Sequence, residues 1–238
     1  MKPIYYLKHL FLFFCLSNPL YAQKMQVQAE VINLEYFKES NESLGMPKAD
    51  ENRVVFMGNS ITQSWKDYSP DFFKENGYIN RGISGQTTFQ MLLRFRTDVI
   101  ALQPKVVVIL AGINDIAQNT GYTPLEIIAD NIKTMAELAD YHGIKVILCS
   151  VLPAKDFPWR RGLEPAQKVV KLNQILKAYA EEKKHTYLDY YTPMEDGEGG
   201  LKVPEYTTAN DLVHPNKAGY LVMESLVKES IDNVINNK

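Results

Sequence analysis

Cysteine is scarce in this chain of 238 residues, which contains only Cys15 and Cys149. Cys15 lies in an N-terminal segment that we expect to be removed, so Cys149 would be the single cysteine of the mature chain. A single cysteine excludes an internal disulfide, even in an oxidising compartment. Cys149 falls in the apolar run from Lys145 to Val151, where we expect a buried and unreactive thiol.

The sequence also lacks an excess of charge of one sign. Its formal net charge is −2, and its basic residues are spread along the chain instead of forming a run. A protein that binds nucleic acid usually gathers basic residues into a patch or stripe. The charge pattern therefore argues against a nucleic-acid partner.

No apolar run near the N-terminus is long enough for a membrane span, because the run from Leu10 to Leu16 is much shorter than the roughly 20 residues that a bilayer requires. Lysines flank this run on its N-terminal side, and Leu20-Tyr21-Ala22 resembles a cleavage site. The pattern predicts a signal peptide over residues 1–22 and an exported protein, periplasmic or secreted, with no stable membrane insertion once the leader is removed. An uncleaved anchor is the alternative. Lipidation at Cys15 is disfavoured because no small residues precede it.

What remains has the composition of an ordinary globular protein, with 45% hydrophobic and 23% charged residues. We expect residues 23–238 to form one domain that needs no disulfide or structural metal to hold its core. Short apolar runs alternate with longer amphipathic segments, which predicts a parallel sheet covered by helices on both faces, in three α/β/α layers. The expected strands are Val54–Met57, Tyr78–Asn80, Val106–Ala111, Val146–Val151 and Thr186–Leu188. The expected helices are Val27–Ser43, Phe89–Ile100, Pro124–Tyr141, Pro165–Lys184 and Lys217–Ile235.

Ser60 is the first candidate for chemistry, because it directly follows a strand and ligands of parallel sheets bind beyond the carboxyl ends of the strands. Gly58 permits a turn there that would raise the Ser60 hydroxyl above the sheet edge at a helix start. A serine in this place can also serve only as a helix N-cap.

Asp211 and His214 are candidates for the base that a nucleophilic serine requires and for the carboxylate that orients this base. They stand three residues apart on one turn, just before the last predicted helix. A solvent-exposed turn is the alternative interpretation. The other histidines are less suited: His9 lies in the leader, His142 at a helix end, and His185 follows two lysines on an expected surface edge.

Gly85 and Asn114 are candidate donors for the oxyanion that forms during acyl transfer. Each lies in a loop that directly follows a predicted strand. Gly85 offers a backbone N–H that no side chain obstructs, and Asn114 offers a side-chain amide. Taken singly, each could instead be an ordinary turn residue.

Together these four segments resemble the sequence blocks of the SGNH hydrolases, the GDSL-like lipases and acylhydrolases, and in particular their acetylesterase and platelet-activating-factor acetylhydrolase-like members. The resemblance runs from about Arg53 to Gly219, in the family's order. Its blocks are Gly58-Asn59-Ser60-Ile61-Thr62, Asn80-Arg81-Gly82-Ile83-Ser84-Gly85, Gly112-Ile113-Asn114-Asp115 and Asp211-Leu212-Val213-His214-Pro215.

The resemblance implies a flavodoxin-like three-layer fold with a triad of Ser60, His214 and Asp211. It also implies an oxyanion hole made of the Ser60 and Gly85 backbone N–H groups and the Asn114 side chain, with no metal or organic cofactor. One position departs from the family pattern, since Asn59 stands where the family usually has aspartate. We expect Asn59 to keep the role of a local hydrogen-bond acceptor.

The sequence thus predicts a serine esterase that works through an acyl-enzyme. No apolar insertion between the blocks is long enough to form a lid or an acyl tunnel, which favours short acyl groups, acetyl above all. Trp159 and Arg160, in the loop from Pro153 to Pro165, are candidates for binding a sugar, although Trp159 could simply anchor its loop. The alternatives are an O-acyltransferase with the same residues, a thioesterase or lysophospholipase with a different pocket, and a non-catalytic carbohydrate-binding protein.

Overall fold

The centre of the molecule is a sheet of five parallel strands, in a computed structural model that describes residues 32–236. Neighbouring strands are parallel throughout, and the spatial order is β2-β1-β3-β4-β5. This is the strand order of the flavodoxin-like doubly wound fold, as predicted. The strands are β1 (Val54–Gly58), β2 (Tyr78–Gly82), β3 (Val106–Leu110), β4 (Lys145–Cys149) and β5 (Thr186–Leu188).

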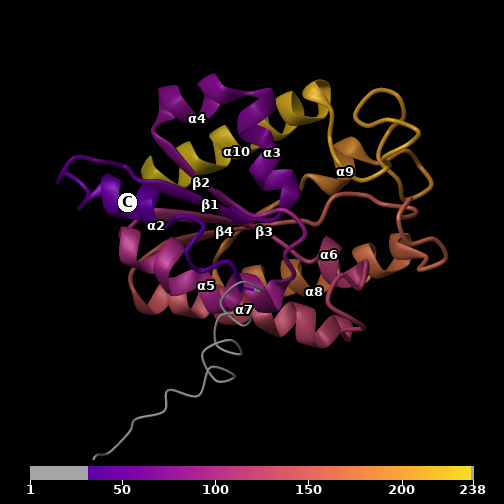
Figure 1. Cartoon of the computed structure of the whole chain (residues 1–238), viewed down its shortest axis with the longest axis horizontal. Coiled ribbons are helices and arrows are strands. Elements are labelled where there is room, and N and C mark those ends of the chain that lie inside the picture. Colours follow the sequence, from indigo (N-terminus) through magenta and orange to yellow (C-terminus); the bar gives the residue numbers. More distant parts are fainter. Residues whose placement is uncertain (1–31, 237–238) are drawn as a thin grey trace, which may run out of the picture.

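Helices cover both faces of the sheet (Figure 1). Every residue of β1 and β3 is buried, which explains why these strands read as unbroken apolar runs in the sequence. Within residues 32–236, no helix has the length and apolar character needed to cross a membrane. One face carries α3 (Ser60–Tyr68), α4 (Pro70–Asn76) and α10 (Lys217–Asn236), and the other carries α5 (Thr88–Asp98), α7 (Leu125–Tyr141) and α8 (Pro165–Lys183). The short helices are α2 (Lys38–Leu44), η1 (Ile100–Leu102), α6 (Ile113–Ile116) and α9 (Tyr191–Met194).

Two hydrogen bonds fasten α3 to α10, the helices that begin nearest the candidate nucleophile and base. The buried Tyr220 hydroxyl donates to the carbonyl of Ile61 at 2.8 Å, and Trp65 Nε1 donates to Glu224 at 3.0 Å. Trp65 also stacks on Phe72, with ring centroids 5.6 Å apart. α3 begins at Ser60, and α10 begins just after the turn that carries His214. The packing of these two helices therefore fixes the position of Ser60 relative to His214.

The sequence-based boundaries agree with the structure for most elements. The predicted ends of α7, α8 and α10 lie within one residue of the observed ends, and those of the five strands lie within two. Cys149 is buried, as predicted, and burial raises the pKa of its thiol far above the usual range.

The predicted N-terminal helix over Val27–Ser43 is confirmed over residues 38–43 and wrong over residues 33–37. Residues 33–37 form turns, Asn33 has a positive φ of 57°, and the helix begins only at Lys38. The Phe37 ring lies 4.6 Å from the guanidinium of Arg81 in β2, a tertiary contact that helical spacing does not foresee. Residues 27–31 of that predicted helix, and the predicted signal peptide, lie outside the described residues.

Candidate active site

Ser60 lies at the carboxyl end of β1, as the first residue of α3. Gly58 has no room for a side chain, because a Cβ there would lie 2.0 Å from Thr62 Oγ1, so glycine lets the first turn of α3 fold tightly against the strand end. Asn59 caps the helix by accepting a hydrogen bond from the Ile61 N–H at 3.0 Å, which confirms the expected acceptor role. The Ser60 N–H therefore belongs to the first helical turn, where backbone donors have no intrahelical partner.

His214 and Asp211 lie on a tight turn just before α10. The Asp211 carboxylate accepts hydrogen bonds from the backbone N–H groups of Val213 at 3.2 Å and His214 at 2.9 Å. Leu212 adopts the left-handed conformation with φ of 66°, and the buried Thr207 hydroxyl donates to the His214 carbonyl at 2.8 Å. The Asp211 carboxylate and the Thr207 hydroxyl thus stabilise the turn that carries His214.

The three side chains form one hydrogen-bonded line. The Ser60 hydroxyl lies 2.9 Å from His214 Nε2, and His214 Nδ1 lies 2.8 Å from Asp211 Oδ1. Burial works against the charged form of Asp211, but the hydrogen bonds from the His214 ring and backbone outweigh it and lower the pKa of the carboxyl. An ionised carboxylate at Nδ1 fixes the proton on that nitrogen and leaves Nε2 free to accept the serine proton.

Gly85 lies in the loop that follows β2, and Asn114 lies in α6, the short helix that follows β3. Gly85 has a φ of 76°, and a Cβ there would meet nothing within 4 Å, so its backbone borders open space. Asn114 is buried and donates one amide hydrogen to the carbonyl of Gln86 at 3.0 Å. Its second amide hydrogen has no hydrogen-bond acceptor among residues 32–236, and an amide donor in that state can serve an oxyanion.

Trp159 and Arg160 lie on the loop between β4 and α8. The Trp159 ring centroid is 6.3 Å from that of His214, and the side chain is 48% exposed, so an aromatic face borders the base. Trp159 also lies against the fully buried Phe157, which anchors the loop. Arg160 Nη1 donates to the backbone carbonyls of Ala117 and Gln118, so this arm of the guanidinium connects two loops of the site.

Sequence reasoning gave no role to Asp115, the residue after Asn114. Its buried carboxylate accepts hydrogen bonds from the Thr88 N–H at 3.0 Å and the Thr88 hydroxyl at 2.7 Å, and so connects the β3 loop to the start of α5. Burial raises the pKa of Asp115 to about 6, although the bonds from Thr88 counteract the shift. The signal available in the sequence was an acidic residue five positions after the end of a buried apolar strand.

Sequence reasoning also gave no role to Arg94, which is fully buried in α5. Arg94 pairs with Asp98 at 2.9 Å and donates to the carbonyls of Gly58 at 3.1 Å and Arg81 at 2.9 Å. Its Nε donates to Gln86, the residue after Gly85. One guanidinium thus joins the ends of β1 and β2 to the Gly85 loop.

The placement of His185 corrects a prediction. We expected it on a surface edge, but its side chain is only 5% exposed and lies against the Tyr179 ring, with centroids 5.8 Å apart. Lys184 before it is left-handed with φ of 61°, which turns the chain inward at the end of α8. His142 is the C-cap of α7, as expected.

Residues 56–222 match the GDSL-like Lipase/Acylhydrolase family, so the chain belongs to this family, and the identification as a hydrolase is confirmed at that level. Two crystal structures from Bacteroides are similar over nearly their whole length. One, named as an acylhydrolase of Bacteroides fragilis, is 48% identical with a TM-score of 0.83, covering 86% of this chain and 98% of that one. The other, named as a GDSL-like lipase of Bacteroides thetaiotaomicron, is 50% identical with a TM-score of 0.82, covering 85% and 98%.

Two further relatives are more distant. A variant of an acetylxylan esterase from Geobacillus stearothermophilus is 20% identical with a TM-score of 0.63, covering 78% of this chain and 96% of that one, which shows the shared fold. An uncharacterized lipoprotein, YqeF of Bacillus subtilis, is 40% identical over 78 residues. That match spans 32% of this chain and 32% of the relative, so the chain covers about a third of that curated protein's length.

Proposed function

We propose that this protein is a serine esterase that hydrolyses short-chain esters, acetyl esters above all, on carbohydrate. The hydrogen-bonded line from Ser60 through His214 to Asp211 carries the proposal, because its distances of 2.9 and 2.8 Å suit transfer of the serine proton to a correctly oriented imidazole. The position of the line at the carboxyl edge of a parallel sheet, where ligands of such folds bind, supports the same function.

The reaction follows from this geometry in two steps. Ser60 Oγ attacks the ester carbonyl carbon while His214 Nε2 takes its proton, and the carbonyl oxygen becomes an oxyanion. The Ser60 and Gly85 N–H groups and the Asn114 amide stabilise that oxyanion, each donor being worth about 3 kcal/mol. The C–O bond then breaks, His214 returns the proton to the leaving alcohol, and water releases the acid from the acyl-enzyme by the same route.

Two observations support a short acyl group and a sugar alcohol. The half-exposed Trp159 lies beside His214, where the leaving alcohol receives its proton, and an aromatic face suits the apolar face of a sugar ring. Fold neighbours include an acetylxylan esterase, and Arg160 extends the same loop. Export to the periplasm or medium fits this substrate, and a lipoprotein relative supports it.

The deciding experiment compares purified wild type and Ser60→Ala, both as residues 23–238, on p-nitrophenyl acetate and on partially acetylated xylo-oligosaccharide. We expect acetate release by the wild type and none above background by the variant, with unchanged circular dichroism. Near-normal turnover by Ser60→Ala would overturn the proposal.

Acyl length and acceptor distinguish the remaining alternatives. For the wild type, kcat/KM should fall from acetyl to octanoyl nitrophenyl esters, because no insertion between the blocks is available to bury added methylenes, each worth about 0.8 kcal/mol. A rise with chain length would favour a lysophospholipase or thioesterase. Acetylated sugar appearing instead of free acetate would identify an O-acyltransferase.

A further inference from the structure

The N-terminal arm, defined here as residues 32–45, lies outside the family-matched residues 56–222 but reaches the candidate active site. It starts at the catalytic edge of the sheet, where the carbonyl of Ile32 accepts a hydrogen bond from Gln86 Nε2 at 2.9 Å. It ends near the amino ends of the strands, where the Gly45 carbonyl accepts a hydrogen bond from Arg53, the residue just before β1. Between these two contacts, the arm lies against Arg81 of the edge strand β2.

Side chains of the arm are held by the buried charges beneath it. The Arg81 guanidinium lies 4.6 Å from the Phe37 ring centroid and donates to Asn41 Oδ1 at 2.9 Å. Asn41 in turn donates to Asp98, the partner of Arg94, at 2.9 Å. Such a network specifies one position for the arm, because each member would otherwise lose a hydrogen bond in a buried place.

Tyr36 is the arm residue whose side chain contacts α3, the helix of the candidate nucleophile. Its hydroxyl accepts a hydrogen bond from Gln63 Nε2 at 3.2 Å, and Gln63 Oε1 accepts one from the backbone N–H of Ser84, the residue before Gly85. Gln63 lies one helical turn after Ser60, on the same side of α3. Tyr36 is thus connected, through one side chain, to both the nucleophile's helix and the loop of the oxyanion donor.

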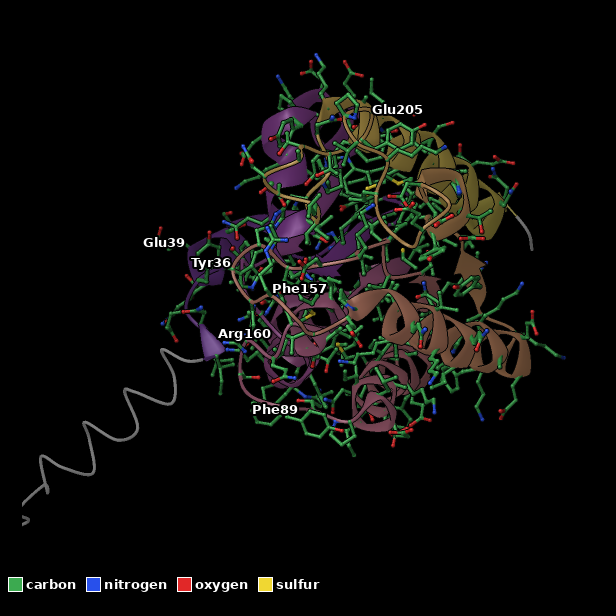
Figure 2. All side chains as sticks on the ribbon, turned by 90° about the vertical axis from the view of Figure 1, so that its right-hand side faces the viewer. Tyr36, Glu39, Phe89, Phe157, Arg160 and Glu205 are labelled. Carbon is green, nitrogen blue, oxygen red and sulfur yellow. The ribbon has the colours of Figure 1, made fainter. Side chains whose placement is uncertain are left out.

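The Tyr36 ring is 52% exposed, and its hydroxyl hydrogen is available to a ligand. Figure 2 shows Tyr36 on the same side of the molecule as Phe157 and Arg160, which belong to the Trp159 loop. Trp159 borders the base His214, whereas Tyr36 is hydrogen-bonded through Gln63 to the Gly85 loop. The base and the oxyanion hole of a serine esterase lie on different sides of the scissile carbonyl, so the two aromatic rings lie on different sides of the site.

We propose that Tyr36 is a specificity-determining residue, the second aromatic wall of the substrate site, which contacts the sugar part of the ester on the side away from Trp159. The inference rests on the proposed esterase function. It assigns to the arm, a segment outside the family match, the selection of carbohydrate esters over small esters.

The test uses Tyr36→Ala and Tyr36→Phe in the chain of residues 23–238, each assayed on partially acetylated xylo-oligosaccharide and on p-nitrophenyl acetate. Loss of one aromatic contact should raise KM for the oligosaccharide about fivefold to tenfold in Tyr36→Ala, with kcat nearly unchanged. The small ester lacks the sugar, so its kinetics should stay within twofold of wild type. Tyr36→Phe keeps the ring and should retain most of the oligosaccharide affinity.

Tyr141→Ala is the matched control, because Tyr141 is also an exposed tyrosine, at 85%. It ends α7 just before β4 begins, and so lies near the amino ends of the strands, away from the candidate active site. It should behave as wild type on both substrates. Equal kinetics of Tyr36→Ala and wild type on the oligosaccharide would overturn the inference. So would a lower kcat on both substrates in Tyr36→Ala and Tyr36→Phe, because that result would mean that Tyr36 only positions the Gly85 loop. An inactive wild type would instead overturn the esterase function itself.

Discussion

Arg94 Nη2 donates to the carbonyl oxygen of Gly58 at 3.1 Å, two residues before the candidate nucleophile. The donor is a fully buried guanidinium on α5, and the acceptor is the last residue of β1. Burial lowers the pKa of Arg94, and the ion pair with Asp98 counteracts this shift. The turn that presents Ser60 therefore depends on a charge held inside the opposite helical layer.

We predict that Arg94→Met lowers the free energy of unfolding by about 3–5 kcal/mol, because it leaves the Asp98 carboxylate buried without its cation. Urea denaturation followed by tryptophan fluorescence would measure the change. Lys228→Met is the matched control, since Lys228 and Asp232 pair at the same helical spacing but are 41% and 48% exposed. An exposed pair contributes below about 1 kcal/mol, and equal effects of the two variants would contradict the role given to burial.

Asp211→Asn should lower kcat by about 10⁴ on p-nitrophenyl acetate, because an amide no longer enforces the proton on His214 Nδ1. Steady-state kinetics with unchanged circular dichroism would check this. Asp67→Asn, which neutralises an exposed carboxylate on α3, serves as the control and should be neutral. If Asp211→Asn kept normal turnover, another acid would have to orient the base.

Asn114→Ala should lower kcat by about 10² to 10³ with little change in KM, as expected for a donor that acts mainly in the transition state. Asn119→Ala is a close comparison, because Asn119 Nδ2 donates to the Gly85 carbonyl at 3.2 Å and so touches the same loop without serving an oxyanion. We expect less than a tenfold effect from it. A rise in KM as the main effect of Asn114→Ala would point to ground-state binding instead.

Asp115 gives a prediction for stability against pH. Its pKa of about 6 in the folded protein lies above the unfolded value near 3.8, so between these values the native state binds more protons. The contribution of Asp115 to stability is therefore most favourable below about pH 4 and decreases by about 3 kcal/mol as the pH rises through 6. Asp115→Asn has no such titration.

The measurement is the difference in unfolding free energy between Asp115→Asn and wild type, from urea titrations at pH 4.5, 5.5 and 7. The unfolding free energy of the variant should increase relative to that of the wild type as the pH rises. The altered hydrogen bonds to Thr88 should lower the variant's unfolding free energy by the same amount at every pH. A difference that does not vary with pH would mean that the Asp115 carboxyl is not desolvated as the structure indicates.

Patterns confined to one segment predicted the structure well. Helices α7, α8 and α10 carry apolar residues at helical spacing and have clear end signals such as Gly143 and Pro165, so their bounds could be read closely. The site could be anticipated for a topological reason. All strands are parallel, so the loops with Ser60, Gly85 and Asn114 had to meet at one edge.

Features that depend on distant residues could not be read in the same way. The arm is turned instead of helical at Phe37, where the ring lies against Arg81, 44 positions later in the sequence. The His185 side chain is only 5% exposed although two lysines precede it, because the left-handed Lys184 directs the chain toward Tyr179. The roles of Asp115 and Arg94 depend on partners in other elements, which no local spacing reveals.

The position of the arm beside β2 also bears on how copies of this chain meet one another. An open edge strand offers unpaired backbone groups on which a second chain can add its own strand. Here β5, at one edge, has only three residues, and β2, at the other, has Phe37, Ser40 and Asn41 of the arm held against its Arg81. Removal of the arm, residues 32–45, would take away these contacts with Arg81, so we expect the arm also to hinder edge-to-edge association through β2.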